Sequence, residues 1–295
     1  MLNDSGRKRK PITKADIKRL RDSLPKRVDI GSEGTKITQK EEVKAEPSDN
    51  AEGVAPVLEE HLPEICVPLS AEEIRSFQIY ASMLREKNKV MNLTAVDDDN
   101  GIAMKHFIDS LTLCPYIKEE QTKAGKNDLT LADIGTGAGF PGMPLKISMP
   151  ELQVTLMDSL AKRLGFLGEV CAALSLDGVN MVHTRAEDGG KDKKYRESFD
   201  IVTARAVAAL PVLAEYCLPF VKIGGVFLAM KGHAEEEIKS ANKAIALLGG
   251  TIEKTDTFRL PGTDMDRSII VVRKIRPTPA RFPRKAGVPA KEPLS

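Results

Sequence analysis

The chain has 295 residues, of which 41% are hydrophobic and 29% charged, with a formal net charge of +2. These proportions are typical of a globular protein with one main core. No apolar run reaches the roughly 18 residues of a membrane-spanning helix, and no apolar stretch follows the basic residues at the amino terminus as it would in a secretory signal. We therefore expect a cytoplasmic protein and exclude a membrane-embedded one.

The first sixty-odd residues show no helical or strand periodicity apart from ADIKRLRDSL (15–24). Charge is also uneven there, with ten Lys or Arg against three Asp in residues 1–27, and three Lys against ten acidic residues in 28–68. Such blocks are commonly solvated and disordered. We interpret residues 1–62 as a disordered extension.

Helical patterns begin at LSAEEIRSFQIYASMLREKN (69–88), where Ser70 followed by Glu73 forms a capping box. A second helical pattern covers GIAMKHFIDSLTLCPYI (101–117), and a polar linker, EEQTKAGKND, follows it. Residues 63–125 are therefore predicted to form a small helical subdomain.

From residue 126 to residue 275 strands alternate with helices, which predicts an α/β core with a parallel sheet covered on both faces. The predicted strands are 129–134, 152–158, 179–184, 199–205, 226–231, 251–260 and 268–275. The last two are joined by a turn without a helix, so they are predicted to pair as an antiparallel hairpin. A mostly parallel seven-stranded sheet that ends in such a hairpin is the arrangement of class I methyltransferases.

A glycine-rich turn follows the first predicted strand, in the sequence DIGTGAGFPGMPL (133–145). Such a turn lets backbone amides approach a ligand at the carboxyl end of the strand. A dinucleotide fingerprint that starts at Gly135 fails at Phe140, and one that starts at Gly137 contains Pro141. The GxGxG spacing favours S-adenosylmethionine over a dinucleotide. Asp158, at the end of the second strand, suits the ribose of either ligand.

Seven ordered motifs carry a closer resemblance: NLTAV (92–96), KHFIDSL (105–111), DIGTGAGFPGMPL (133–145), LMDSLAKRLGFL (156–167), HTRAED (183–188), FDIVTARAVAAL (199–210) and AMKG (229–232). With these motifs the chain, from about Leu69 to the carboxy terminus, resembles the ribosomal small subunit methyltransferase G family, also called glucose-inhibited division protein B. The resemblance implies transfer of a methyl group from S-adenosyl-L-methionine to N7 of a guanine in 16S ribosomal RNA, guanine 527 of the decoding region. Naked RNA and the small ribosomal subunit both stay open as the substrate.

The same resemblance implies a set of cofactor-binding positions. They are Asp133, Gly135, Thr136, Gly137, Phe140, Pro141, Asp158, Ser159, Ala186, Glu187 and Arg205. Asp158 would bind the ribose, Ala186 and Glu187 would border the adenine, and Arg205 would complete the site near the methyl group as its catalytic residue. Two positions depart from the family pattern, Lys87 in place of a usual tryptophan and Gly165 in place of a larger residue.

The residues also limit the acceptor atom. After the fourth strand the chain has Arg-Ala-Val-Ala-Ala (205–209), not the Asn or Asp, Pro, Pro, aromatic cluster that methylates exocyclic amines. Cys217 is poorly placed to act as the nucleophile of a pyrimidine C5 methyltransferase. Guanine N7 has a free lone pair and needs no general base, so positioning suffices. A catalytic triad of His106, Asp109 and Ser110 is rejected because neighbours on a helix rarely have triad geometry.

The carboxy-terminal segment 276–295, RPTPARFPRKAGVPAKEPLS, mixes basic residues with Pro and Gly. That composition suits an extended arm along RNA phosphates. The predicted RNA contacts are Lys231, Arg276, Arg281, Arg284 and Lys285. We expect removal of this arm to weaken RNA binding more than cofactor binding. The competing functions are a noncatalytic adenosine-nucleotide-binding module docked on RNA, and an NAD-dependent oxidoreductase.

The four cysteines, Cys66, Cys114, Cys171 and Cys217, are scattered without a CxxC pair. This spacing predicts neither a zinc site nor a disulfide framework. We expect reduced thiols and no metal.

Overall fold

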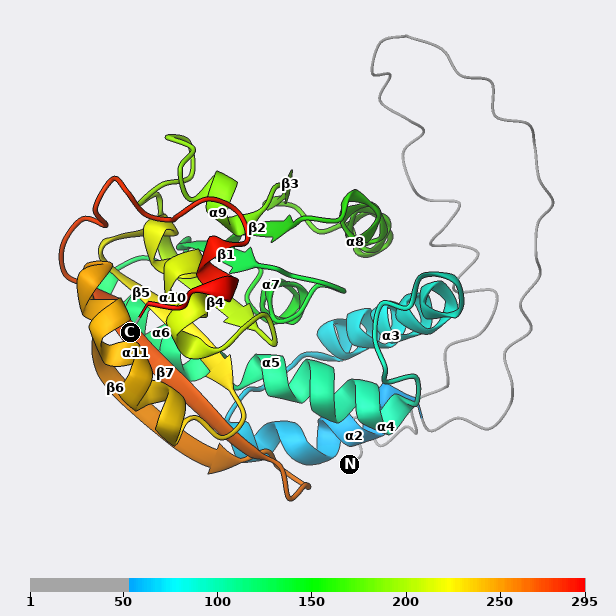
Figure 1. Cartoon of the computed structure of the whole chain (residues 1–295). Coiled ribbons are helices and arrows are strands. Elements are labelled where there is room, and N and C mark those ends of the chain that lie inside the picture. The colour runs from blue at the N-terminus through cyan, green and yellow to red at the C-terminus, as the bar shows by residue number, and fades with distance from the viewer. Residues whose placement is uncertain (1–52, 295) are drawn as a thin grey trace, which may run out of the picture. The chain divides into compact units, whose positions relative to one another are not determined.

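A computed structural model of the chain describes residues 53–294 (Figure 1). The helical elements are α2 (Val54–His61), η1 (Leu62–Ile65), α3 (Ala71–Met91), α4 (Asp99–Gly101), η2 (Ile102–Ile108), α5 (Asp109–Leu111), α6 (Cys114–Ala124), α7 (Gly142–Ser148), α8 (Ala161–Leu174), α9 (Ala186–Gly189), α10 (Leu210–Cys217), η3 (Leu218–Phe220), α11 (Glu235–Leu247) and α12 (Val288–Lys291). The strands are β1 (Thr130–Ile134), β2 (Gln153–Asp158), β3 (Val179–His183), β4 (Phe199–Arg205), β5 (Val221–Lys231), β6 (Gly250–Arg259) and β7 (Asp266–Lys274).

The seven strands form one sheet in the order β3-β2-β1-β4-β5-β7-β6. The first five run parallel, and β7 pairs antiparallel with both β5 and β6. This confirms the predicted class I methyltransferase fold with its terminal hairpin. Chain order reverses direction at β1 and β4, so their carboxyl ends form the switch point where α/β sheets bind ligands.

The helical region differs from the sequence prediction at two boundaries. Helix α2 lies in the range that we expected to be disordered, because Val54 and Leu58 bury their side chains against the core. The predicted helix 101–117 is interrupted, since a new helix, α6, begins at Cys114 with Pro115 in its first turn and continues into the expected linker. The predicted capping box of Ser70 and Glu73 is present and begins α3. The expected extension up to residue 52 lies outside the described residues.

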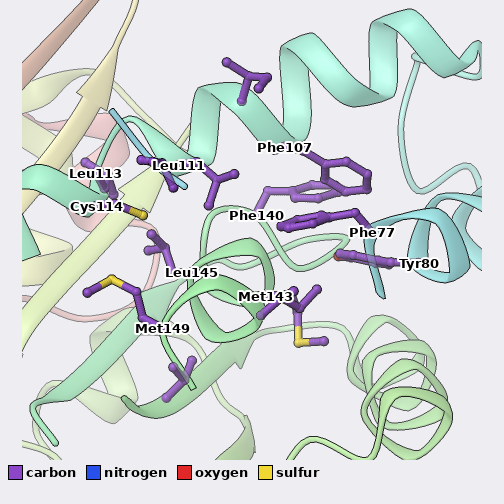
Figure 2. Packing of buried hydrophobic residues seen from close by; sticks show 14 of the residues in the cluster. Phe77, Tyr80, Phe107, Leu111, Leu113, Cys114, Phe140, Met143, Leu145 and Met149 are labelled. Atoms are coloured by element: carbon purple, nitrogen blue, oxygen red, sulfur yellow. The ribbon is translucent and has the colours of Figure 1, made fainter. Parts of the chain in front are cut away.

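A stack of aromatic rings joins the helical region to the glycine-rich turn (Figure 2). The rings of Phe77 and Phe107 lie 4.8 Å apart between centroids, and Tyr80 stacks on Phe140 at 5.6 Å. Phe77, Tyr80 and Phe107 are completely buried. Because Phe140 belongs to the turn after β1, α3 and η2 form part of the same core as the sheet.

All four cysteines are free thiols, as expected, with Cys114 and Cys217 buried. Within residues 53–294 no helix is long and apolar enough to cross a membrane. The same residues contain no cluster of three His, Cys, Asp or Glu side chains that could hold a metal ion.

Candidate active site

The glycine-rich turn adopts left-handed backbone conformations that favour glycine. Gly135 has φ +73°, and a Cβ added there would lie 2.9 Å from Cγ2 of Val207. Gly139 has φ +106°, and its added Cβ would lie 2.7 Å from a methyl carbon of Leu167. A side chain at either position would strain the backbone and clash, so the turn requires glycine there.

Asp133 organises this turn from inside the protein. Its Oδ2 accepts hydrogen bonds from the Thr136 hydroxyl at 2.7 Å and from the Gly142 amide at 2.9 Å. The side chain is fully buried, Oδ1 has no hydrogen-bond partner, and burial raises the pKa of this carboxyl to about 6. The structure therefore gives Asp133 and Thr136 the task of shaping the turn.

A cavity of about 500 Å³ opens at the carboxyl ends of β1, β2 and β4. Five predicted cofactor positions line it: Gly135, Asp158, Ser159, Ala186 and Glu187. Its size is in the range of small-molecule sites.

The sequence did not identify four further lining residues, Arg163, Val207, Tyr216 and Gly287. Arg163 stands in the LMDSLAKRLGFL motif, five residues after Asp158 and one helical turn into α8, so its position was the available signal. Tyr216 and Gly287 gave none, because only the packing of distant segments places them here.

Asp158 lies in the wall of this cavity and is almost fully buried. Its Oδ1 accepts from the Leu160 amide at 2.8 Å, and its Oδ2 accepts from the Gly137 amide at 2.9 Å and from Arg163 Nη1 at 3.3 Å. A carboxylate offers about four acceptor positions. One is therefore open to a ribose hydroxyl, and movement of the partly exposed Arg163 would open a second.

A second cavity of about 380 Å³ adjoins the first, and Ala206 lines both. Arg205, Asp109, His106, Lys231 and Arg267 are among its lining residues. Ala206 has φ +56°, an uncommon conformation for a residue other than glycine. The strained backbone after β4 thus stands at the junction of the two cavities.

Arg205 pairs with Asp109, not with Asp133 or Glu187, which were the acidic residues considered as partners from the sequence. Its Nη1 lies 2.9 Å from Asp109 Oδ2 and also donates to the Lys105 carbonyl at 2.8 Å. Arg267 donates from Nε to Asp109 Oδ1 at 2.7 Å. One nearly buried carboxylate therefore holds two guanidinium groups at the second cavity.

His106 is held between the two sites in its uncharged form. Its ring stacks on Phe140 with centroids 4.5 Å apart, and its Nε2 lies 2.7 Å from the Thr94 hydroxyl. Burial, together with the nearby Arg205, lowers the pKa of His106 to about 4. Ser110 donates to the His106 backbone carbonyl at 2.5 Å and not to the ring, so no triad geometry exists.

Four predicted cofactor positions do not line the first cavity. Thr136, Gly137, Phe140 and Pro141 lie in the turn itself, and the Arg205 guanidinium sits 5.2 Å from the Phe140 ring centroid. Gly137 acts through its amide on Asp158. Lys231, a predicted RNA contact, forms an ion pair with Glu237 at 2.9 Å and lines the second cavity.

The carboxy-terminal segment corrects the expectation of an extended arm. Phe282 and Pro289 are buried, and the segment contains helix α12. Arg284 pairs with the buried Glu215 at 2.6 Å, and Arg276 donates to the Ala246 carbonyl at 2.7 Å. The core contains a carboxylate that needs a cationic partner, so the segment folds onto it. Arg281 and Lys285, both exposed, stay predicted RNA contacts.

Comparison with known proteins identifies the family. The profile described as rRNA small subunit methyltransferase G matches residues 73–269. The chain belongs to the rRNA small subunit methyltransferase G family. Members named Ribosomal RNA small subunit methyltransferase G include one from Acetivibrio thermocellus, which is 53% identical over 78% of this chain and 92% of its own length. Another, from an Exiguobacterium species, is 50% identical over 77% of this chain and 93% of its own length.

A solved structure with a similar fold is the 16S rRNA (adenine(1408)-N(1))-methyltransferase of Catenulisporales acidiphilia with cosubstrate SAM, at 16% identity, 55% coverage of this chain, 92% coverage of that chain and TM-score 0.43. The family match confirms the resemblance drawn from the seven motifs. As a methyltransferase G family member, the chain is an enzyme whose cofactor is S-adenosyl-L-methionine.

Proposed function

We propose that this enzyme transfers the methyl group of S-adenosyl-L-methionine to N7 of a guanine in 16S ribosomal RNA. The observation that carries the proposal is the pair of cavities that meet at Ala206. One has a wall suited to a nucleoside and the other is lined by cationic and polar side chains. A cofactor in the first would present its methyl group toward a base in the second.

The first cavity fits the cofactor on three observations. Asp158 has an acceptor position open to a ribose hydroxyl. Gly135 leaves the backbone bare where a side chain would meet Val207. Glu187, at the far wall, uses only Oε1 in a hydrogen bond among the described residues. Once bound, the cofactor supplies an electrophilic methyl group on a sulfonium.

The second cavity suits an acceptor that needs no proton removed. Guanine N7 attacks through its lone pair as the carbon–sulfur bond breaks, so the products are N7-methylguanine with a positive charge and a neutral thioether. His106 stays uncharged at neutral pH because its pKa is about 4, and it adds no positive charge against the forming cation. Arg205 and Arg267 are neutralised in part by Asp109 and can donate to guanine O6 or to a phosphate.

RNA would bind around the mouth of this second cavity, where Lys105, Lys231 and Arg267 line the wall. Contacts between such cations and phosphates release counterions, so affinity is expected to fall steeply with salt. Competition titrations of small-subunit RNA at several salt concentrations measure that slope.

The test is to incubate the enzyme with radiolabelled S-adenosyl-L-methionine and small-subunit RNA from a strain without the activity. Cleavage at N7-methylguanine then maps the label. Label at one guanine in the decoding-centre loop is the expected result, on naked RNA or on intact subunits. Label on another atom, or none on either substrate, would overturn the proposal.

A further inference from the structure

The carboxy-terminal segment 282–294 lies on the core beside the first cavity, where Figure 1 shows it in red next to α10. We propose that this segment is a wall of the cofactor cavity, and that Gly287 is a positioning residue that holds Glu187 at the nucleoside end of the cofactor. The proposal rests on the proposed function, since it takes this cavity as the cofactor site. It replaces the expectation that the segment serves RNA binding above all.

A buried ion pair fixes the segment on one side of Gly287. Glu215, on α10, is fully buried. Its carboxylate accepts from the Arg284 amide at 2.8 Å, from Nε at 3.0 Å and from Nη2 at 2.6 Å. An unpaired buried carboxylate is strongly unfavourable, so the fold holds Arg284 at this position. The next residue along α10, Tyr216, lines the cavity.

A second arginine fixes the start of the segment from the opposite side. Arg196 donates from Nη1 to the Phe282 carbonyl at 2.8 Å and from Nη2 to the Thr278 carbonyl at 2.7 Å. Its Nη1 also donates to the Gly190 carbonyl at 2.8 Å, just after α9. Phe282 itself is buried in the core cluster that contains Phe199 and Phe220. The backbone that leads to Gly287 is therefore attached to the core before it reaches the cavity.

Gly287 then reaches the cavity wall. Its amide donates to Glu187 Oε1 at 2.8 Å, and both residues line the cavity. Gly287 has φ +82°, a conformation that favours glycine, and the buried Pro289 follows in α12. The second oxygen, Glu187 Oε2, has no hydrogen-bond partner among the described residues.

This geometry divides the Glu187 carboxylate between two tasks. The Gly287 amide occupies Oε1 and fixes the direction of the carboxylate, and Oε2 stays available to a donor in the cavity. The exocyclic amine of an adenine is such a donor. Without the segment, Glu187 would lose this hydrogen bond and the wall beside it, so cofactor affinity should fall before RNA affinity does.

The first experiment uses a chain that ends at Lys285, which removes Gly287 and α12 but keeps Arg284 paired with Glu215. Isothermal titration with S-adenosyl-L-methionine is expected to show affinity weakened about tenfold, as for loss of a hydrogen bond to a charged group. Affinity for small-subunit RNA should change less than twofold. Lys291→Ala is the matched control, because it removes an exposed cation of the same segment that makes no described side-chain contact.

The second experiment tests the anchor. Arg284→Ala should raise the KM for S-adenosyl-L-methionine with kcat nearly unchanged, and Arg284→Lys should restore part of the loss. If Arg284→Ala does not fold, the shortened chain still decides. Unchanged cofactor affinity in the folded shortened chain, or a larger loss of RNA affinity, would overturn the inference. Failure of the intact enzyme to bind the cofactor would instead overturn the proposed function.

Discussion

Asp109 Oδ2 accepts a hydrogen bond at 2.9 Å from Nη1 of Arg205, which lies 96 residues further along the chain. The contact joins the helical region, where Asp109 begins α5, to the carboxyl end of β4. Both side chains are largely buried, at 5% and 14% exposure. Their pairing fixes the wall of the second cavity at the point where it meets the cofactor cavity.

We expect Asp109→Asn to lower kcat about a hundredfold, because a wall displaced by about 1 Å misplaces the base against the methyl group. The variant leaves Arg205 and Arg267 without their shared anion. Cofactor affinity should stay within about twofold, since Asp109 does not line that cavity. Single-turnover methyl transfer with saturating cofactor measures the rate.

Asp264→Asn is the control for this variant, because Asp264 is fully exposed in the β6–β7 turn. It should retain wild-type rates. Equal losses of rate and of cofactor affinity in Asp109→Asn would show that the pair supports the fold in general and not the acceptor cavity.

We expect Asp158→Ala to weaken cofactor binding about tenfold or more. The carboxylate is nearly buried in the cavity wall, and a hydrogen bond from a ribose hydroxyl to a charged group contributes about 1.5–3 kcal/mol. Equilibrium dialysis with S-adenosyl-L-methionine measures the change. Wild-type affinity in a folded variant would remove Asp158 from the cofactor site.

The strands and the glycine-rich turn could be predicted because local patterns encode them. All seven predicted strands are present within a few residues, and β5 extends furthest from its prediction, beginning at Val221 instead of 226. The turn between Asp133 and Gly142 required left-handed backbone that glycine alone adopts easily. Asp158 followed from its place at a strand end.

Contacts between distant segments could not be predicted in the same way. Nothing in the composition of the carboxy-terminal segment shows that Glu215 is buried and needs Arg284, so its basic residues suggested a free arm. The partner of Arg205 was missed for the same reason, since Asp109 lies on a helix whose packing the local pattern does not fix. Tertiary burial decided both cases.

We expect Tyr80→Phe to lower the free energy of unfolding by about 1–3 kcal/mol and to weaken cofactor binding. The buried Tyr80 hydroxyl donates to the Ala138 carbonyl in the glycine-rich turn, and the variant leaves that buried acceptor unpaired. Urea unfolding and cofactor titration check the two effects. Tyr195→Phe serves as the control, because the Tyr195 hydroxyl makes no described hydrogen bond; similar losses in both variants would contradict the assignment.

His106 should make stability depend on pH in a defined direction. Burial and Arg205 lower its pKa from 6.5 to about 4 in the folded protein. As pH falls below 6.5, the unfolded chain binds a proton first, so the contribution of His106 to stability is fully present above pH 6.5 and is lost toward pH 4. Asp133, whose pKa is raised to about 6, changes stability in the opposite direction over much of this window. The difference in unfolding free energy between wild type and His106→Gln cancels the Asp133 effect, and urea titrations from pH 4 to 7 should show it rising with pH. A difference that stays constant would mean that His106 titrates normally in the folded protein and carries a charge below pH 6.5 beside the acceptor base.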